Sequence, residues 1–299
     1  MKIIINPKEY SDQYLFNLNK CFNGWGDKNN YDWVFNRDLD EYQSDIILIN
    51  NENNQPLAGS AITYRKIVND DGIEQQIGIM TGSWTLPEAR GKGCFTKMIE
   101  VSKKVCLEKN VRHLTAFVVQ TNPSYRRLQN AGSILIPTSH YISNSSVSLT
   151  DGKINILLKD SKNQEMIYER YNKLHSTIPR FKYTFEEFIK QYINRLSNTE
   201  LIKINKDFAI IEETETIVKI LLVTYENMSS CRDNILDIIS WVKSNMSKET
   251  LFYSSNKELD KFFKHDKFEY IPGFFTVLNT SVQNDFIFEG ININMGDKM

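Results

Sequence analysis

The chain has 299 residues, of which 41% are hydrophobic and 24% charged, so its composition is that of a globular protein of roughly two domains. Lysine and arginine number 36 against 37 aspartates and glutamates, a formal net charge of −1, so composition supplies no excess positive charge for a nucleic-acid backbone. The apolar runs are too short to cross a bilayer, and the first residues lack the apolar core of a secretory signal. We therefore expect a cytoplasmic protein that binds neither nucleic acid nor membrane.

Cysteine and histidine are scattered along the chain. No two cysteines form a C-x-x-C pair, and the histidines are equally dispersed. This spacing predicts neither a disulfide framework nor a metal site. The cysteines are Cys21, Cys94, Cys106 and Cys231.

The first 86 residues predict a strand, a helix, a loop and a meander. The strand is expected at 2–5 and the helix at 8–22, where apolar residues recur at helical spacing. Residues 23–33 are rich in Gly, Asn and Asp and predict a loop. Alternating apolar runs separated by turn sequences then predict antiparallel strands at 45–50, 57–68 and 75–86.

The periodicity changes after residue 86. Apolar residues from Phe95 to Cys106 fall on one helical face, and residues 113–120 form the short apolar run of a buried strand. Residues 122–132 begin with Asn-Pro and end with Gly, as a short helix does. A strand at 134–143 closes this half of the chain.

The order of elements is repeated after a polar linker at 144–152. A strand, two helices, a second meander, a helix, a strand and a further helix followed by strands are expected there. We interpret this order as an internal duplication. The predicted domains are 1–145 and 150–299.

The stretch "LPEARGKGCF" at 86–95 places two glycines just before the predicted helix. A helix N-terminus offers unpaired amides and a partial positive charge, and glycine lets an anion approach the backbone closely. Arg90 and Lys92 add formal positive charge. The sequence matches neither the P-loop nor the complete dinucleotide-binding pattern. We therefore predict a phosphate-binding turn of another kind.

The stretch "GSWTLPEARGKGCFTKMIEVSKKVCLEKN" resembles the acetyl-CoA-binding motif of the GCN5-related N-acetyltransferases (GNAT), Q/R-x-x-G-x-G/A at a helix start. The likeness covers 1–143 by element order, and Phe95 departs from the motif where Gly or Ala is usual. It implies an α+β fold of two tandem GNAT-like domains, each a mixed, mostly antiparallel sheet flanked by helices. It also implies a bulge that separates the strand before Pro87 from its neighbour, with acetyl-CoA as acyl donor. The cofactor-binding residues that it implies are Trp84, Thr85, Arg90, Gly91, Lys92, Gly93, Cys94, Phe95 and Asn122.

The resemblance further implies that an amine attacks the thioester directly in a ternary complex. Many relatives carry a glutamate on the strand before the motif, but here Glu74 and Glu88 lie only near its two ends. The tyrosine that protonates the leaving thiolate in many relatives is missing at its usual place, Leu128 or Gln129. Tyr125 lies one turn earlier, and we name it as the candidate catalytic acid, with packing or substrate contact as the alternative.

Several other residues leave two interpretations open. Cys94 is either a nucleophile at a helix N-terminus or a small filler. His140 either lines a substrate cleft or lies on a strand surface. The aromatic residues Trp25, Tyr31, Trp33 and Phe35 either form a substrate wall or pack in the core. The acids Asp27, Asp32, Asp38, Asp40 and Glu41 either attract a cationic acceptor or form a solvated face.

The second half carries "YENMSSCRDN" where the first has its glycine turn. Without glycine, close approach of a phosphate is disfavoured. We therefore interpret 150–299 as a degenerate copy that binds the acceptor or forms a homodimer. The predicted function is acetyl transfer to a primary amine of a small molecule or peptide, antibiotic-like amines included. The alternatives are an aminoacyl-tRNA-dependent transferase of tandem GNAT-like fold and a non-catalytic CoA-binding sensor or scaffold.

Overall fold

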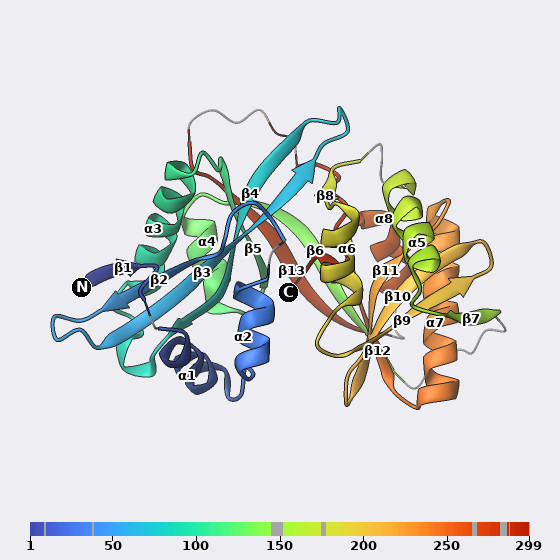
Figure 1. Ribbon diagram of the computed structural model, residues 1–299, viewed down its shortest axis with the longest axis horizontal. Helices are drawn as coiled ribbons and strands as arrows, with labels where there is room; N and C mark the ends of the chain where they lie inside the picture. The colour runs from blue at the N-terminus through green and yellow to red at the C-terminus, as the bar shows by residue number, and fades with distance from the viewer. Residues whose placement is uncertain are drawn as a thin grey trace. The chain divides into compact units, whose positions relative to one another are not determined.

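The computed structural model describes residues 1–8, 10–37, 39–144, 152–174, 178–264, 268–281, 286 and 288–298. The chain forms two compact units, each built from separate stretches of sequence (Figure 1). The first unit comprises Met1–Lys66, Gln75–Ile136 and Phe275–Phe286. The second comprises Ile67–Glu74, Pro137–Phe274 and Ile287–Met299.

The first unit contains the elements that the sequence predicts for the first half. The strands are β1 (Lys2–Ile5), β2 (Asp45–Asn50), β3 (Pro56–Val68), β4 (Glu74–Thr85), β5 (His113–Val119) and the start of β6 (Ile134–Ser143). The helices are α1 (Ser11–Phe22), α2 (Lys28–Phe35), α3 (Cys94–Glu108) and α4 (Pro123–Asn130), with a 3-10 turn at Pro87–Ala89. In the sheet β1, β2, β3, β4 and β5 are neighbours in that order, and part of β13 (Phe268–Asn279) follows β5.

Helix α2 corrects the prediction of a loop at 23–33. The Asp27 side chain accepts a hydrogen bond from the Asn30 amide at 3.0 Å, and the Asn30 side chain accepts one from the Asp27 amide at 2.9 Å. This reciprocal pair is a capping box, so the polar residues start a helix instead of breaking one. Tyr31 and Phe35, one helical turn apart, then bury their rings.

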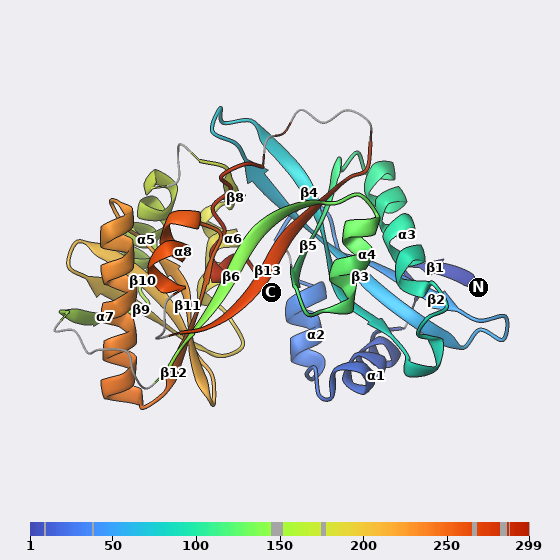
Figure 2. The same ribbon diagram turned by 180° about the vertical axis from the view of Figure 1, so that it is seen from behind.

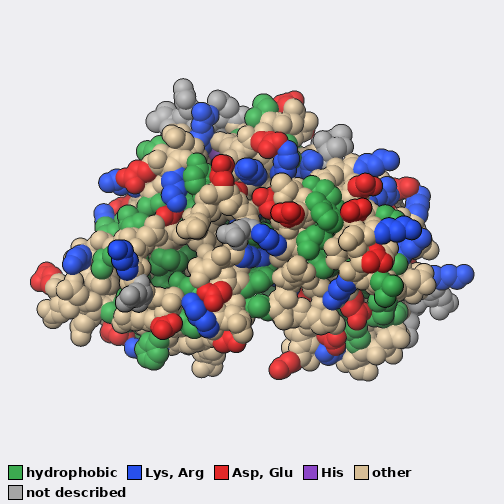
Figure 3. Space-filling view, in the orientation of Figure 1, with side chains coloured by type: hydrophobic (Ala, Val, Ile, Leu, Met, Phe, Trp, Pro, Cys, Tyr) green, Lys and Arg blue, Asp and Glu red, His purple; other side chains and the backbone are tan. Residues whose placement is uncertain are grey.

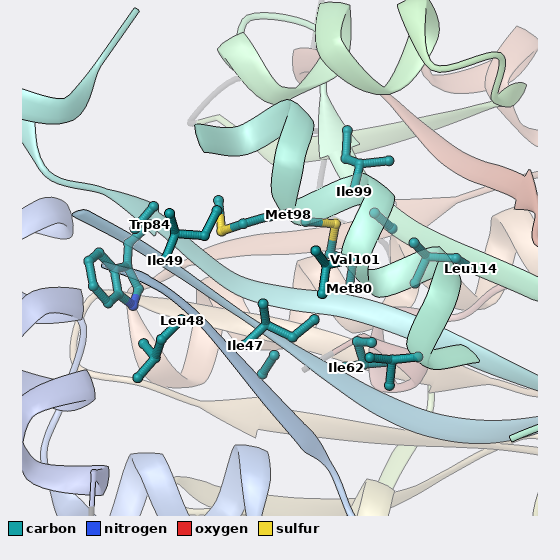
Figure 4. Packing of buried hydrophobic residues seen from close by; sticks show 14 of the residues in the cluster. Ile47, Leu48, Ile49, Ile62, Met80, Trp84, Met98, Ile99, Val101 and Leu114 are labelled. Atoms are coloured by element: carbon teal, nitrogen blue, oxygen red, sulfur yellow. The ribbon is translucent and has the colours of Figure 1, made fainter. Parts of the chain in front are cut away.

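The core of the first unit has helices on both faces of its sheet. Helix α3 covers one face and α1 and α2 lie against the other (Figure 1), while α3 and α4 lie side by side in both views (Figures 1 and 2). Figure 4 shows Met98 and Ile99 of α3 in one cluster with Ile49 of β2, Met80 of β4 and Leu114 of β5. The apolar residues of α3 therefore recur at the spacing that places them on the face that packs against the sheet.

Trp84 of β4 packs on the backbone of Gly59 in the neighbouring strand. A Cβ atom at Gly59 would lie 2.6 Å from Cε2 of the indole, which is 2% exposed. We expect Gly59→Ala to destabilise the fold by about 1–3 kcal/mol, because a well-packed core resists an added methyl group. Urea denaturation measures the change. In the double variant Gly59→Ala/Trp84→Phe, we expect the free energy of unfolding to fall by less than the sum of the two single losses. Additive losses would contradict this packing.

The second unit repeats the order of the first. Its strands are β7 (Ile154–Leu157), β8 (Arg180–Lys182), β9 (Asn198–Ile204), β10 (Asp207–Glu213), β11 (Ile217–Val223) and β12 (Glu249–Ser254). Its helices are α5 (Ser161–Leu174), α6 (Phe185–Phe188), α7 (Met228–Met246) and α8 (Lys257–Phe263), with a π-turn at Ile189–Ile193 and a 3-10 turn at Met295–Asp297. In the sheet β6, β12, β11, β10, β9 and β7 are neighbours in that order. The meander β9–β10–β11, then α7, β12 and α8, matches β2–β3–β4, then α3, β5 and α4.

The compact units differ from the predicted division at 1–145 and 150–299. Phe275–Phe286 belongs to the first unit, where β13 is the neighbour of β5, and most of β6 belongs to the second, where it pairs antiparallel with β12. The last strand of each repeat has therefore exchanged its neighbour. Sequence order cannot reveal this, because either choice of neighbour satisfies the same apolar pattern.

None of the described helices is both long and apolar enough to span a membrane. On the face drawn in Figure 3, Lys and Arg side chains alternate with Asp and Glu side chains over the surface. The described part of that face therefore presents no continuous basic surface.

Candidate active site

Strands β4 and β5 are paired over only three residues and then separate. Their parallel register joins Ile77 to His113, Gly78 to Leu114 and Ile79 to Thr115. The Thr115 hydroxyl donates to the Gly78 carbonyl at 3.0 Å just before this point. Beyond it, residues 80–85 of β4 and 116–119 of β5 continue as strands without pairing to each other. The backbone groups on the β5 side of β4 can therefore bind an extended ligand.

Gly82 lies within the separated part of β4 and has a φ of +54°. This left-handed conformation is rare inside a strand and is found at β-bulges, where glycine adopts it without steric cost. Its ideal Cβ position would lie 2.7 Å from Cζ of Phe35. We therefore assign the bulge that the resemblance implied to Gly82, beyond the last pair of β4 with β5.

The glycine turn leads from β4 into α3. Gly91 and Gly93 have φ of +76° and +80°, and a Cβ atom at either would meet no atom within 4 Å. Gly93 is the N-cap of α3 and supplies no side-chain cap. Among the described residues, none accepts a hydrogen bond from the amides of Gly91 or of residues 93–96. These amides have no acceptor in the described part of the chain and lie at the positive end of a 15-residue helix, which favours an anion.

The glycine turn carries two basic side chains. Arg90 and Lys92 are exposed, and no carboxylate of the described residues forms an ion pair with either. Glu88, between the turn and β4, pairs instead with Lys20 at 3.6 Å. The turn therefore combines free amides with two unpaired positive charges, a combination that suits a pyrophosphate.

The side chains of Trp84, Cys94 and Phe95 pack into the protein. Trp84 is buried against α1, with its ring 5.7 Å from that of Tyr14, so only its backbone belongs to the open strand edge. Phe95 is half-buried and packs on the core, so the departure from Gly or Ala leaves the turn open. Cys94 is buried, its Sγ lies 3.9 Å from the Ala89 carbonyl, and burial raises the pKa of its thiol. These contacts favour the filler interpretation of Cys94.

Helix α4 starts beside the end of β5. The Asn122 side chain caps it, accepting hydrogen bonds from the Ser124 amide at 3.0 Å and the Ser124 hydroxyl at 2.9 Å. Tyr125 is half-buried on the first turn, and Leu128 is fully buried one turn later. The structure thus gives Asn122 a capping role, and its contact with a cofactor stays a prediction. Leu128 occupies a packing position.

Neither candidate base lies on the separated part of β4. Glu74 is at the opposite end of the strand, where it forms an ion pair with Lys182. Hydrogen bonding from its own backbone and the nearby lysines lower the pKa of the exposed Glu88. Glu88 is therefore a poor proton acceptor for a bound amine, and Glu74 lies at the far end of β4 from its separated part.

The open alternatives for the aromatic residues are partly resolved. Tyr31 and Phe35 are buried in the core, and Trp25 stacks on Phe35 at 5.8 Å, so these three pack. Trp33 instead lies under the Arg37 guanidinium at 3.6 Å. The core interpretation is therefore right for most of this set.

The acidic residues of the same region have local partners. Asp27 caps α2, Asp32 pairs with Lys28 at 3.1 Å, Asp40 accepts from the Tyr42 amide at 3.1 Å, and Glu41 lies 3.9 Å from Lys66. Asp38 lies outside the described residues. These contacts favour ordinary local roles over attraction of a cationic acceptor.

His140 belongs to the second unit. It is half-buried, with Nε2 at 2.5 Å from Nζ of Lys298, and burial together with that cation lowers the pKa of His140 to about 3. It is therefore neutral at physiological pH and packs against its neighbours. No cluster of three potential metal ligands occurs among the described residues.

The second unit repeats the strand separation but not the open turn. Strands β11 and β12 pair in parallel only over Ile217–Lys219 and Glu249–Leu251. Here the N-cap is Asn227, whose side chain accepts from the Ser230 amide at 2.9 Å. Residues 292–295 of this same chain line the gap between the strands, which leaves a cavity of about 40 Å³. Sequence reasoning found the missing glycines but not this segment, which has no local signal.

No protein-family model matches the sequence, and no curated protein is significantly similar to it. Solved structures share the fold. A tandem GNAT protein from the clavulanic acid biosynthesis pathway is 10% identical, with 95% of this chain and 100% of that chain covered and a TM-score of 0.63. A GCN5-related N-acetyltransferase from Anabaena variabilis is 15% identical, with 94% of this chain and 74% of that chain covered and a TM-score of 0.63. An N-myristoyltransferase from Saccharomyces cerevisiae with bound myristoyl-CoA is 10% identical, with 93% of this chain and 82% of that chain covered and a TM-score of 0.62. The chain therefore has the tandem GNAT fold that its motif predicted.

Proposed function

We propose that this protein is an acyltransferase that moves the acetyl group of acetyl-CoA to a primary amine of a small molecule or peptide. The observation that carries the proposal is that two features occur together in the first unit. Strands β4 and β5 separate after Ile79 and Thr115, and an open glycine turn follows β4. One feature suits the extended pantetheine arm, and the other suits the pyrophosphate.

In this proposal the amides of Gly91 and residues 93–95 hold the pyrophosphate, because those of Arg90 and Lys92 already donate to the Pro87 and Ala89 carbonyls. The side chains of Arg90 and Lys92 add charge. Backbone groups of Trp84 and Thr85 pair with the pantetheine arm. The side chain of Trp84 then has a second task, since its packing on Gly59 fixes the strand whose edge binds the donor. The fold is shared with an N-myristoyltransferase that binds myristoyl-CoA, which supports an acyl-CoA donor here.

The proposed chemistry is a single displacement. The neutral amine attacks the thioester carbonyl, the carbon–sulfur bond breaks, and the CoA thiolate takes up a proton as the amine nitrogen loses one. Tyr125, on the first turn of α4 beside the end of β5, is our candidate for the proton donor. The separated part of β4 carries no carboxylate, so water is the proposed acceptor of the amine proton.

We assign acceptor binding or dimerisation, and not donor binding, to the second unit. Its gap between β11 and β12 is lined by residues 292–295, and the start of α7 is capped by Asn227. We expect calorimetric titration of the full chain with CoA to give one site per chain. Two sites would contradict this assignment.

Two alternatives predict different substrates. An aminoacyl-tRNA-dependent transferase needs a basic surface for RNA, whereas the described charges of the face in Figure 3 alternate in sign. A CoA-binding sensor would bind acetyl-CoA without turning it over, and the lack of a carboxylate on the open part of β4 is the feature that favours it.

The test of the proposal is release of free thiol from acetyl-CoA in the presence of a panel of polyamines and aminoglycosides. We expect release that depends on at least one amine, with the acetylated amine found by mass spectrometry. Tight CoA binding with no release for any amine would favour the sensor. Absence of CoA binding would refute the proposal.

Cys94 allows a check on direct attack. Because burial raises the pKa of the Cys94 thiol, it is protonated at neutral pH and a poor nucleophile. We expect Cys94→Ala to keep kcat within about threefold of the parent chain, where loss of a true nucleophile would be far more damaging. Trapping of an acetylated Cys94 during turnover would contradict direct attack.

A further inference from the structure

The separated part of β4 is held from one side by α1. The Tyr14 hydroxyl of α1 donates a hydrogen bond to the Gly82 carbonyl at 2.9 Å, and the Tyr14 side chain is 0% exposed. Burial raises the pKa of Tyr14 well above its ordinary value, so the hydroxyl keeps its proton and remains a donor. Three residues after Gly82 on β4, the Thr85 carbonyl lies 3.6 Å from the Cys21 thiol of α1.

The bulge itself is also clamped by aromatic rings. Phe35 approaches Gly82 so closely that a Cβ atom would lie 2.7 Å from its Cζ. Tyr14 in turn meets Phe35 and Trp84 edge to face, both at 5.7 Å between ring centroids. The left-handed residue of β4 therefore has a fixed ring beside it and one buried donor on its carbonyl.

We infer that Tyr14 is a positioning residue for the acyl donor, holding the Gly82 bulge so that the free edge of β4 presents its backbone groups to the pantetheine arm. This inference rests on the proposed function. Tyr14 acts through Gly82 and would touch neither CoA nor the reacting atoms.

The physical reason lies in the geometry of a bulge. A bulge sets which way the following peptide groups point, because one extra residue reverses the alternation along a strand. If the carbonyl of Gly82 can rotate, the amides and carbonyls from Ser83 to Thr85 lose their fixed direction. Paired strands such as β3 and β10 have a second neighbour that prevents this, whereas β4 here has no β5 partner.

Tyr14→Phe tests the hydroxyl while keeping the ring. The probes are acetyl-CoA and its 3′-phospho-ADP fragment, which contains the pyrophosphate but no pantetheine arm. We expect the Kd for acetyl-CoA to rise about three- to tenfold, the size of one lost hydrogen bond. The Kd for 3′-phospho-ADP should stay within about twofold, because the glycine turn is untouched.

Tyr31→Phe is the matched control. Tyr31 is 4% exposed and packs on Tyr14 and Phe35, yet the described residues give its hydroxyl no hydrogen-bond partner. We expect it to leave both Kd values unchanged. Equal effects of the two variants on acetyl-CoA, or equal weakening of both probes by Tyr14→Phe, would overturn the inference. If the parent chain binds neither probe, the proposed function itself fails and the inference falls with it.

Discussion

Gly93→Asp should abolish acetyl-CoA binding while the protein stays folded. Gly93 is the N-cap of α3, and the amides of residues 93–96 have no acceptor among the described residues. A carboxylate placed there would lie beside these amides and repel the pyrophosphate. We expect the Kd for acetyl-CoA to rise roughly 100-fold or more, since two negative charges would meet in a partly desolvated site. Calorimetric titration measures the loss, and circular dichroism verifies the fold.

Gly72→Asp is the matched control for backbone strain. Gly72 has a φ of +78°, close to that of Gly93, and its Cβ position is equally free of neighbours, but it lies in the turn between β3 and β4. We expect this variant to bind acetyl-CoA like the parent chain. If a folded Gly93→Asp keeps the parent affinity, the glycine turn does not hold the pyrophosphate.

Tyr125→Phe should lower kcat by on the order of 10²- to 10⁴-fold if its hydroxyl protonates the leaving thiolate. The change removes one oxygen from a half-buried ring on α4 and leaves the Asn122 cap in place. The Kd for acetyl-CoA should be nearly unchanged, because a general acid acts in the transition state. Steady-state kinetics with the best amine of the panel give both values.

Tyr270→Phe provides the comparison for this variant, since Tyr270 is 37% exposed and lies on β13. We expect parent-like kinetics from it. A loss of less than about threefold in Tyr125→Phe would assign thiolate protonation to water or another residue.

Local chemistry was enough to predict an open glycine turn and the elements around it. The apolar stripe from Phe95 to Cys106 predicted α3, and the spacing of Gly91 and Gly93 before it predicted an open N-terminus. Separation of β4 from β5 followed only from the resemblance. No residue pattern marks the point after Thr115 where pairing stops, because an unpaired strand keeps the same apolar alternation.

Three features of the structure could not be predicted from the sequence, each for a different physical reason. The sequence does not reveal helix α2, because Asp27 and its neighbours are residue types that occur in loops as often as in helix caps. The exchange of β6 and β13 was missed because strand partners are chosen at long range. The segment at 292–295 has no local signal, because it is held in the second unit by tertiary contacts, such as the Ile293 amide donating to the Ser255 hydroxyl at 2.9 Å.

A crystal structure of the complex with CoA tests the central claim most directly. We predict one CoA per chain, with its pyrophosphate on the amides of Gly91 and residues 93–95 and its pantetheine arm along residues 80–85 of β4. The gap between β11 and β12 should still be lined by residues 292–295. A CoA molecule bound in that second gap, or bound to the first unit away from the glycine turn, would contradict the account.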